Sequence, residues 1–142
     1  MGKMVWNETL SVGIDLIDDQ HKTWIARVND LSAAIAEHEA QRQIAVTLGF
    51  LIDYTKFHIA TEEKHMTAHT NPGLAEHQQK HKELLGTLND LVQDFEEEGP
   101  TQMLADSVNT FLGNWLIKHI QQIDHKFGVF VREQGIVITE QG

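Results

Sequence analysis

The feature that most constrains the fold is a three- and four-residue apolar period that recurs in four long segments of the chain. This spacing places apolar side chains on one face of an α-helix, and no long segment alternates as a strand does. The predicted helices span residues 19–38, 41–69, 72–96 and 101–126. Because the connections are short, we expect an all-α protein folded as an antiparallel up-down-up-down four-helix bundle.

The remaining residues lie at the two ends of the chain. Residues 1–17 have no helical period, and we expect them to form an N-terminal arm laid over the bundle. Asp18 or Asp19 would then be the N-cap of the first helix. Residues 127–142 begin near Gly128 and are expected to be a short C-terminal helix or tail. The whole chain, residues 1–142, is predicted to be a single domain.

Composition excludes several kinds of protein. The chain has 11 Lys and Arg against 21 Asp and Glu, a net charge of −10 that repels nucleic acid and anionic membranes. No apolar run reaches the ~18 residues of a membrane span, and no signal-peptide pattern is visible, so we expect a cytoplasmic protein without membrane insertion. Cysteine is absent, which leaves nitrogen and oxygen as the donors for any metal.

Seven potential metal ligands fall near one end of the predicted bundle once the helices alternate in direction. They are His21, His58, Glu62, His77, His81, His119 and Asp124. All except Asp124 lie on the apolar stripe of their helix. Because a buried polar atom without a partner costs ~1–3 kcal/mol, a metal is the expected partner for such a set.

The number and type of these donors indicate two metal ions. Seven ligands are too many for one tetrahedral zinc, and five imidazoles are too soft a set for magnesium or calcium. Two octahedral ions offer twelve positions. Five imidazoles, two bridging carboxylates and a bridging solvent oxygen fill all but one of them, so one position stays open.

Asp124 is the ligand whose position on its helix needs explanation. It follows His119 by five residues, about 140° around an ideal helix, whereas Ile123 lies on the stripe. Either the carboxylate reaches across between the metals, or the helix has a wide turn near residues 119–124. We predict the wide turn, since such bulges are frequent at functional sites.

Four segments together resemble the bacterial hemerythrins, a family of non-haem di-iron oxygen-binding proteins. The segments are LSVGIDLIDDQH at 10–21, YTKFHIATEEKHM at 54–66, NPGLAEHQQKH at 71–81 and WLIKHIQQID at 115–124. They cover nearly the whole chain, in order, each on its own helix.

The resemblance implies a ligand assignment, with two iron ions per chain joined by a bridging oxo or hydroxo oxygen. One iron, coordinatively filled, would be held by His77, His81 and His119. The other iron, which has the open position for dioxygen, would be held by His21 and His58. The bridging carboxylates would be Glu62 and Asp124.

The resemblance also implies reversible dioxygen binding for storage, delivery or sensing, and no enzymatic activity. Leu116, with Trp115 nearby, would line a dry oxygen pocket. An oxygen-consuming acceptor protein could be a partner, and a monomer is expected. Ile59 and Asn71 replace residues that are usually aromatic in the family, which should alter packing and leave the site intact.

Two other functions remain open on sequence grounds. The same ligands could serve a di-iron enzyme acting on peroxide, nitric oxide or oxygen. The bundle could also bind metal for a purely structural purpose, or bind none.

The other four histidines are predicted not to be ligands. They are His38, His65, His69 and His125, of which His65 returns to nearly the same face as His58 after seven residues. Ligand histidines need hydrogen-bond acceptors behind them, and Glu63 or Gln20 could serve.

Overall fold

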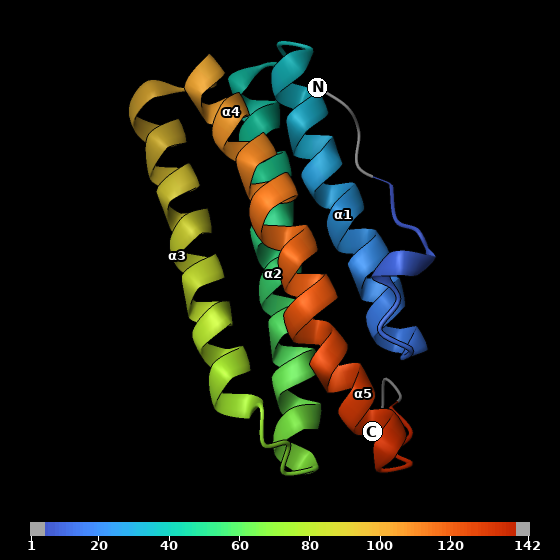
Figure 1. Cartoon of the computed structure of the whole chain (residues 1–142). Coiled ribbons are helices and arrows are strands. Elements are labelled where there is room, and N and C mark those ends of the chain that lie inside the picture. Colours follow the sequence, from blue (N-terminus) through green and yellow to red (C-terminus); the bar gives the residue numbers. More distant parts are fainter. Residues whose placement is uncertain (1–4, 139–142) are drawn as a thin grey trace.

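Four helical rods form the molecule, and each runs antiparallel to its neighbours along the chain (Figure 1). The computed structural model describes residues 5–138, without the side chains of residues 109 and 112–114. The helices are α1 (Asp15–Ala36), α2 (Gln41–Ala68), α3 (Leu74–Glu98), and a last rod from α4 (Gln102–Thr110) to α5 (His125–Glu133). Both α1 and α3 pack against α2 and α4. The predicted four-helix bundle is confirmed, and the described residues contain no strand.

The last rod runs without a break from α4 to α5 through two π-helical segments, Phe111–Leu116 and His119–Asp124. The wide turn predicted at residues 119–124 is therefore confirmed. There, the N–H of His125 donates to the carbonyl oxygen of Ile120, five residues earlier. This turn takes in one residue more than a regular α-helical turn.

The other π-helical segment, Phe111–Leu116, shifts the buried face of the rod relative to a regular period. Leu116 and Ile120 are fully buried, whereas Trp115 and Ile123, which the regular period places in the core, are only partly buried. The prediction that Ile123 lies on the buried stripe is thus wrong by about one residue. Leu112, also on the predicted stripe, lies outside the described side chains.

The described part of the arm, residues 5–14, lies against the bundle and buries Val12 and Ile14. The first helix begins at Asp15, earlier than predicted, so neither Asp18 nor Asp19 is its N-cap. Instead, the carboxylate of Asp18 accepts hydrogen bonds from the N–H of Val12 (2.8 Å) and the hydroxyl of Ser11. This aspartate fixes the arm to α1. Residues 1–4 and 139–142, the outer parts of the predicted arm and tail, lie outside the described residues.

Gly128 does not separate a C-terminal helix from the bundle, because it lies within α5. A Cβ atom at this position would lie 1.9 Å from the carbonyl oxygen of Val12. The glycine is needed for the close approach of the arm to α5.

Two helices end at non-glycine residues with left-handed backbone, His38 (φ 55°) after α1 and Thr70 (φ 52°) after α2. The third helix begins at Leu74, two residues later than predicted. Asn71 therefore caps the preceding turn, where its side-chain oxygen accepts a hydrogen bond from the N–H of Gly73 (2.7 Å).

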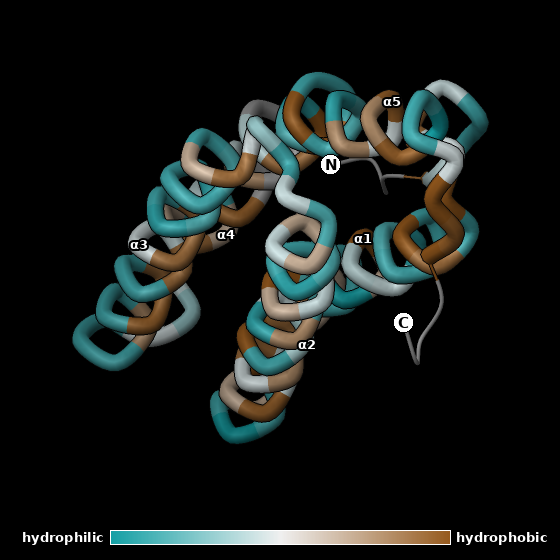
Figure 2. The backbone as a smooth tube through the Cα atoms, turned by 90° about the horizontal axis from the view of Figure 1, so that it is seen from below, coloured by the Kyte–Doolittle hydropathy of each residue, from teal (hydrophilic) through white to brown (hydrophobic). Residues whose placement is uncertain are grey.

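The core has two halves of different chemistry. Hydropathy along α3 shows the general pattern, with hydrophilic positions on the outer side and hydrophobic positions toward α4 (Figure 2). In the upper half of Figure 1, here called the apolar half, the core consists of buried apolar side chains from all four rods. They include Leu31, Ile35, Ile44, Leu48, Leu91, Phe95, Leu104 and Val108. The lower half, here called the metal half, has the buried polar residues. In residues 5–138, no helix is long and apolar enough to cross a membrane.

Candidate metal centre

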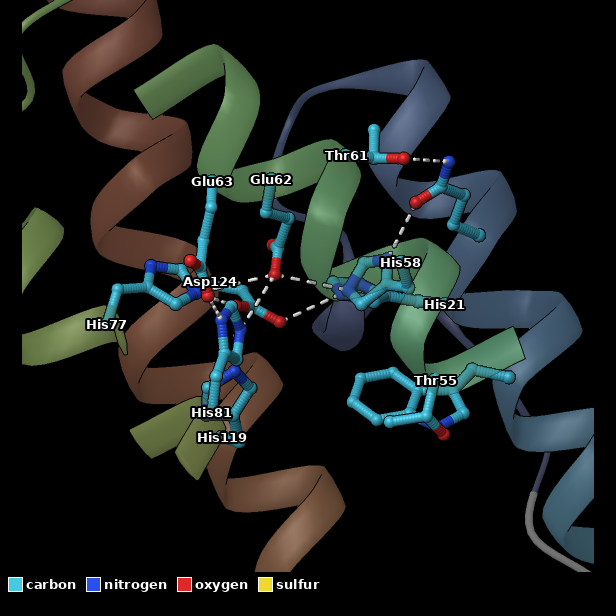
Figure 3. A network of polar contacts seen from close by, with 12 residues as sticks. His21, Thr55, His58, Thr61, Glu62, Glu63, His77, His81, His119 and Asp124 are labelled. Atoms are coloured by element: carbon cyan, nitrogen blue, oxygen red, sulfur yellow. Dashed lines mark hydrogen bonds and ion pairs between the residues drawn. The ribbon is translucent and has the colours of Figure 1, made fainter. Parts of the chain in front are cut away.

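The seven predicted ligands lie together inside the metal half, and every rod contributes at least one (Figure 3). None is more than 4% exposed. His21 comes from α1, His58 and Glu62 from α2, His77 and His81 from α3, and His119 and Asp124 from the second π-helical segment. Antiparallel packing brings them together because the ligands lie early in α1 and α3 and late in α2 and the last rod.

The donor atoms divide into two groups, within each of which all atoms lie within 4.8 Å of one another. One group consists of Glu62, His77, His81, His119 and Asp124. The other consists of His21, His58, Glu62 and Asp124. The two carboxylates belong to both groups, as bridging ligands of a metal pair would.

Asp124 directs its two oxygens to different groups. Its Oδ1 lies 2.7 Å from Nε2 of His77 and 3.0 Å from Nε2 of His119, whereas its Oδ2 lies 2.8 Å from Nε2 of His21. The π-helical segment makes this arrangement possible, because it places His119 and Asp124, its first and last residues, close enough for contact.

Glu62 lies between the imidazoles of the two groups (Figure 3). Its Oε1 lies 3.2 Å from Nε2 of His58, 3.2 Å from Nε2 of His81 and 3.4 Å from Nε2 of His77. One oxygen atom thus contacts imidazoles of both groups.

Most of these donor atoms are close to one another without being hydrogen-bonded. Within the described part of the chain, neither oxygen of Glu62 has a hydrogen-bond partner, and the same holds for the Nε2 atoms of His21, His58, His81 and His119. These imidazole nitrogens and carboxylate oxygens lie close enough to form hydrogen bonds, but their angles do not fit hydrogen-bond geometry. This is expected when their lone pairs point at a shared centre. Leaving each such atom unpaired costs ~1–3 kcal/mol. Two cations between the groups would satisfy them, so the residues fit a dinuclear metal group.

The electrostatics of the centre favour anionic carboxylates. Burial opposes ionisation of Glu62, but the nearby imidazoles, His58 foremost, hold the pKa of its carboxyl well below its usual value. Burial opposes ionisation of Asp124 as well, and the imidazoles of His119 and His21 lower the pKa of its carboxyl. Burial alone would lower the pKa of His77, yet the two carboxylates raise it to about 10. The pair of carboxylates is therefore charged at neutral pH, the form that binds cations.

Two of the histidines have the hydrogen-bond acceptors that the sequence suggested. Nδ1 of His58 lies 2.7 Å from Oε1 of Gln20, and Nδ1 of His81 lies 2.7 Å from Oε2 of Glu63. A proton on each Nδ1 leaves the lone pair of Nε2 facing the carboxylates, which is the tautomer that binds metal.

The two residues predicted to line an oxygen pocket take different positions. The indole of Trp115 stacks on the ring of His119, with centroids 4.6 Å apart and planes 12° from parallel. Leu116 is completely buried. Trp115 therefore fixes the orientation of a predicted ligand.

Sequence reasoning singled out neither Trp24 nor Phe127 as part of the site, yet both contact the centre. The ring of Trp24 lies 4.8 Å from that of His58, and the ring of Phe127 lies 6.4 Å from that of His77. The indole N–H of Trp24 donates to the hydroxyl of Thr55 (2.9 Å), so it presents no free donor to the centre. The only signal in the sequence was the position of Trp24, one turn after His21.

The remaining histidines belong to neither ligand group within the described residues. His38, His69 and His125 are exposed. His65 is buried, and burial lowers the pKa of its imidazole. It lines a groove of about 620 Å³ between α1 and α2, outside the metal centre.

A helical bundle that buries five imidazoles and two shared carboxylates defines a class of protein built for a non-haem pair of metal ions. Comparison with known proteins agrees. The model of the Hemerythrin HHE cation binding domain matches residues 12–130 of the chain. The chain belongs to the hemerythrin family.

Individual relatives show the same likeness over most of their length. The bacteriohemerythrin of Stenotrophomonas maltophilia (strain R551-3) is 30% identical over 128 residues, covering 89% of this chain and 80% of the relative. The myohemerythrin of Riftia pachyptila is 29% identical over 123 residues, covering 87% and 89%. A crystal structure of wild-type hemerythrin matches with a TM-score of 0.80 and 30% identity, covering 90% of this chain and 97% of that one.

Proposed function

We propose that this chain binds dioxygen reversibly at a di-iron centre, for oxygen storage, delivery or sensing. The observation that supports this most directly is the pair of donor groups that share Glu62 and Asp124. When bound, two ferrous ions joined by an oxo or hydroxo oxygen would supply the electrons for reversible binding of dioxygen. The other steps depend on side chains of the chain itself.

The ligand roles follow the two groups. His77, His81 and His119 would hold one iron, and His21 and His58 the other. The latter group has one imidazole fewer, which leaves room for dioxygen. The division of the Asp124 oxygens between the groups supports its role as a bridge.

Exclusion of water is the second task of the protein. Protons and water promote lasting oxidation of the metals, so a reversible site needs apolar walls. Leu116 and Trp24 are fully buried, and the Trp24 indole N–H is already bound to Thr55. We assign Leu116, together with Trp115 over His119, to the wall of the oxygen pocket.

The donor set favours binding of oxygen over catalysis. Di-iron carboxylate proteins of the ferritin-like class use a Glu from each of two helices and a Glu-x-x-His motif from each of the others. Here five histidines accompany two carboxylates. We therefore expect a carrier or sensor and no enzyme, acting as a cytoplasmic monomer that gives up oxygen to an oxygen-consuming acceptor.

The test is a visible spectrum of the iron-loaded protein, reduced without oxygen, then exposed to air, then degassed. We expect about two irons per chain and a new absorption band that appears in air and disappears on degassing over repeated cycles. Turnover of peroxide or nitric oxide without that band would favour an enzyme. Substantially fewer than two irons per chain after iron-replete expression would contradict the di-iron site.

A further inference from the structure

Two of the candidate ligands, one unique to each donor group, are backed by acceptors of different charge. His58 donates its Nδ1 proton to the neutral amide of Gln20, and His81 donates its proton to the carboxylate of Glu63. Both distances are 2.7 Å, so the two contacts differ in charge and not in length.

The orientation of the Gln20 amide is fixed by a second contact. The hydroxyl of Thr61 donates to the carbonyl oxygen of Phe57 (3.0 Å) and so can only accept from the amide nitrogen of Gln20 (3.4 Å). This directs the amide oxygen of Gln20 toward His58. Gln20 is only 5% exposed, so its contact with His58 lies largely within the protein.

The side chain of Glu63 is also held by a second contact, but its acceptor group is a carboxylate and not a neutral amide. Its Oε2 accepts from His81, and its Oε1 accepts from the side-chain amide of Gln78 (3.2 Å). Both oxygens of the carboxylate therefore act as acceptors.

This difference has an electronic consequence. An anionic acceptor behind a ligand imidazole draws the Nδ1 proton away and raises the basicity of Nε2, whereas a neutral amide does so less. A more basic ligand stabilises the more highly charged, oxidised state of the metal that it holds.

We propose that Gln20 is a positioning residue that keeps the His58 side of the centre harder to oxidise than the His81 side. By withholding negative charge from the group with the open position, Gln20 favours release of oxygen over lasting oxidation. This inference rests on the proposed di-iron function and adds to it a residue that sets the redox balance between the two irons.

The test exchanges the two acceptors, with Gln20→Glu and Glu63→Gln as separate variants of the full-length iron-loaded protein. The matched controls make the same exchanges at exposed positions in the apolar half, Gln43→Glu and Glu96→Gln. Iron per chain, the thermal unfolding midpoint and the midpoint reduction potential are measured for all four.

We expect Gln20→Glu to lower the midpoint potential and Glu63→Gln to raise it, with two irons retained in both. Each shift should reach about tenfold in the oxidation equilibrium, which is about 59 mV for one electron. The ferrous form of Gln20→Glu should also oxidise irreversibly in air faster than the parent protein. The two control variants should change the equilibrium by less than about threefold, because their charges are distant and screened by solvent.

Potential shifts of opposite sign in the two variants, at unchanged iron content, distinguish tuning of the reduction potential from a merely structural role. If both variants shift the potential in the same direction, or no further than their controls, the proposal is overturned. Loss of iron from Gln20→Glu counts against it too, and Glu63→Gln, at a partly exposed side chain, remains a second test less sensitive to packing.

Failure of the proposed function gives a different result. A parent protein that holds two irons but shows no oxygen-reversible band would refute oxygen carriage, while the opposite potential shifts would still support the role of Gln20. A parent protein that binds no iron would overturn both.

Discussion

The apolar half and the metal half are built on the same four rods but stabilised by different forces. In the apolar half, residues such as Leu48 and Leu91 are almost completely buried, and they stabilise the fold because their apolar surface is removed from water. In the metal half, the equivalent interior positions hold imidazoles and carboxylates with unpaired donor atoms. Burial alone stabilises the first half, whereas the unpaired donor atoms of the second half are ones that a bound cation would satisfy.

One helical pattern encodes both a structural core and a candidate metal centre. His58 and Glu62 continue the stripe on which Leu48 and Leu51 lie. A single helix therefore presents apolar side chains to one half and candidate ligands to the other. The two halves should respond independently to perturbation.

Removing the metal is the strongest way to separate the halves. After chelation under reducing conditions, we expect amide protection to fall by at least tenfold around His58 and His77. Protection around Leu48 and Leu91 should persist, because that core needs no metal. Hydrogen exchange measured by mass spectrometry would decide this, and an equal loss in both halves would show that they do not behave separately.

Replacing one ligand sharpens the same contrast. His77→Ala removes an imidazole that contacts both Glu62 (3.4 Å) and Asp124 (2.7 Å). We expect the loss of at least one iron per chain and of the oxygen-dependent band, measured by metal analysis and visible spectroscopy. The control is His38→Ala, at an exposed residue outside both groups. Loss of iron from this control would refute the ligand assignment.

A core substitution in the apolar half should have the converse effect. Leu48→Ala should lower the free energy of unfolding by ~2–5 kcal/mol through lost burial and a cavity. Iron content and spectrum should remain unchanged, since Leu48 lies far along α2 from His58. Val46→Ala, at a residue 43% exposed on the same helix, is the control and should cost much less. Denaturant unfolding with parallel metal analysis would measure both.

The arm provides a smaller test, at its contact with α5 near the metal half. Gly128→Ala would place a methyl group against the carbonyl oxygen of Val12, so the arm must shift. We expect a loss of ~1–3 kcal/mol in the free energy of unfolding, measured by chemical denaturation. Gly86→Ala on α3, where a Cβ meets nothing within 4 Å, should instead stabilise by up to ~1 kcal/mol. Equal effects at the two glycines would contradict the close approach.

The smallest expected effect is at the turn after α2, in the metal half. Thr70 has φ 52°, a conformation that costs a non-glycine residue ~1–2 kcal/mol. Glycine avoids this cost, but its greater freedom in the unfolded chain offsets part of the gain. Thr70→Gly should therefore raise the free energy of unfolding by less than ~1 kcal/mol. Thermal unfolding would show a small increase in the midpoint, with no change in iron binding. A decrease would mean that the threonine side chain contributes more than its backbone strain costs.

Much of this architecture could be predicted from the sequence because it depends on local periodicity. The number and direction of the helices followed from the three- and four-residue steps. The wide turn at residues 119–124 followed from the five-residue step between His119 and Asp124. The acceptors Gln20 and Glu63 could be proposed because each precedes or follows a candidate ligand directly.

Other features could not be predicted because they depend on contacts between distant segments. Asp18 resembles an N-cap, and only the fold shows that it binds the backbone of Val12. Gly128 resembles a helix break, and its purpose is visible only once the arm lies on α5. The π-helical segment Phe111–Leu116 gave no signal, because both Trp115 and Leu116 are plausible core residues.

The two π-helical segments make the metal centre depend on residue number as well as residue type. In the second of them, Asp124 follows His119 by five residues, and the wider turn brings both residues to the interior. In a regular helix the same five-residue step would carry Asp124 about 140° around the axis from His119, off the interior face. A homologue with a regular helix at this five-residue step would keep every histidine and still lose the carboxylate that both donor groups share.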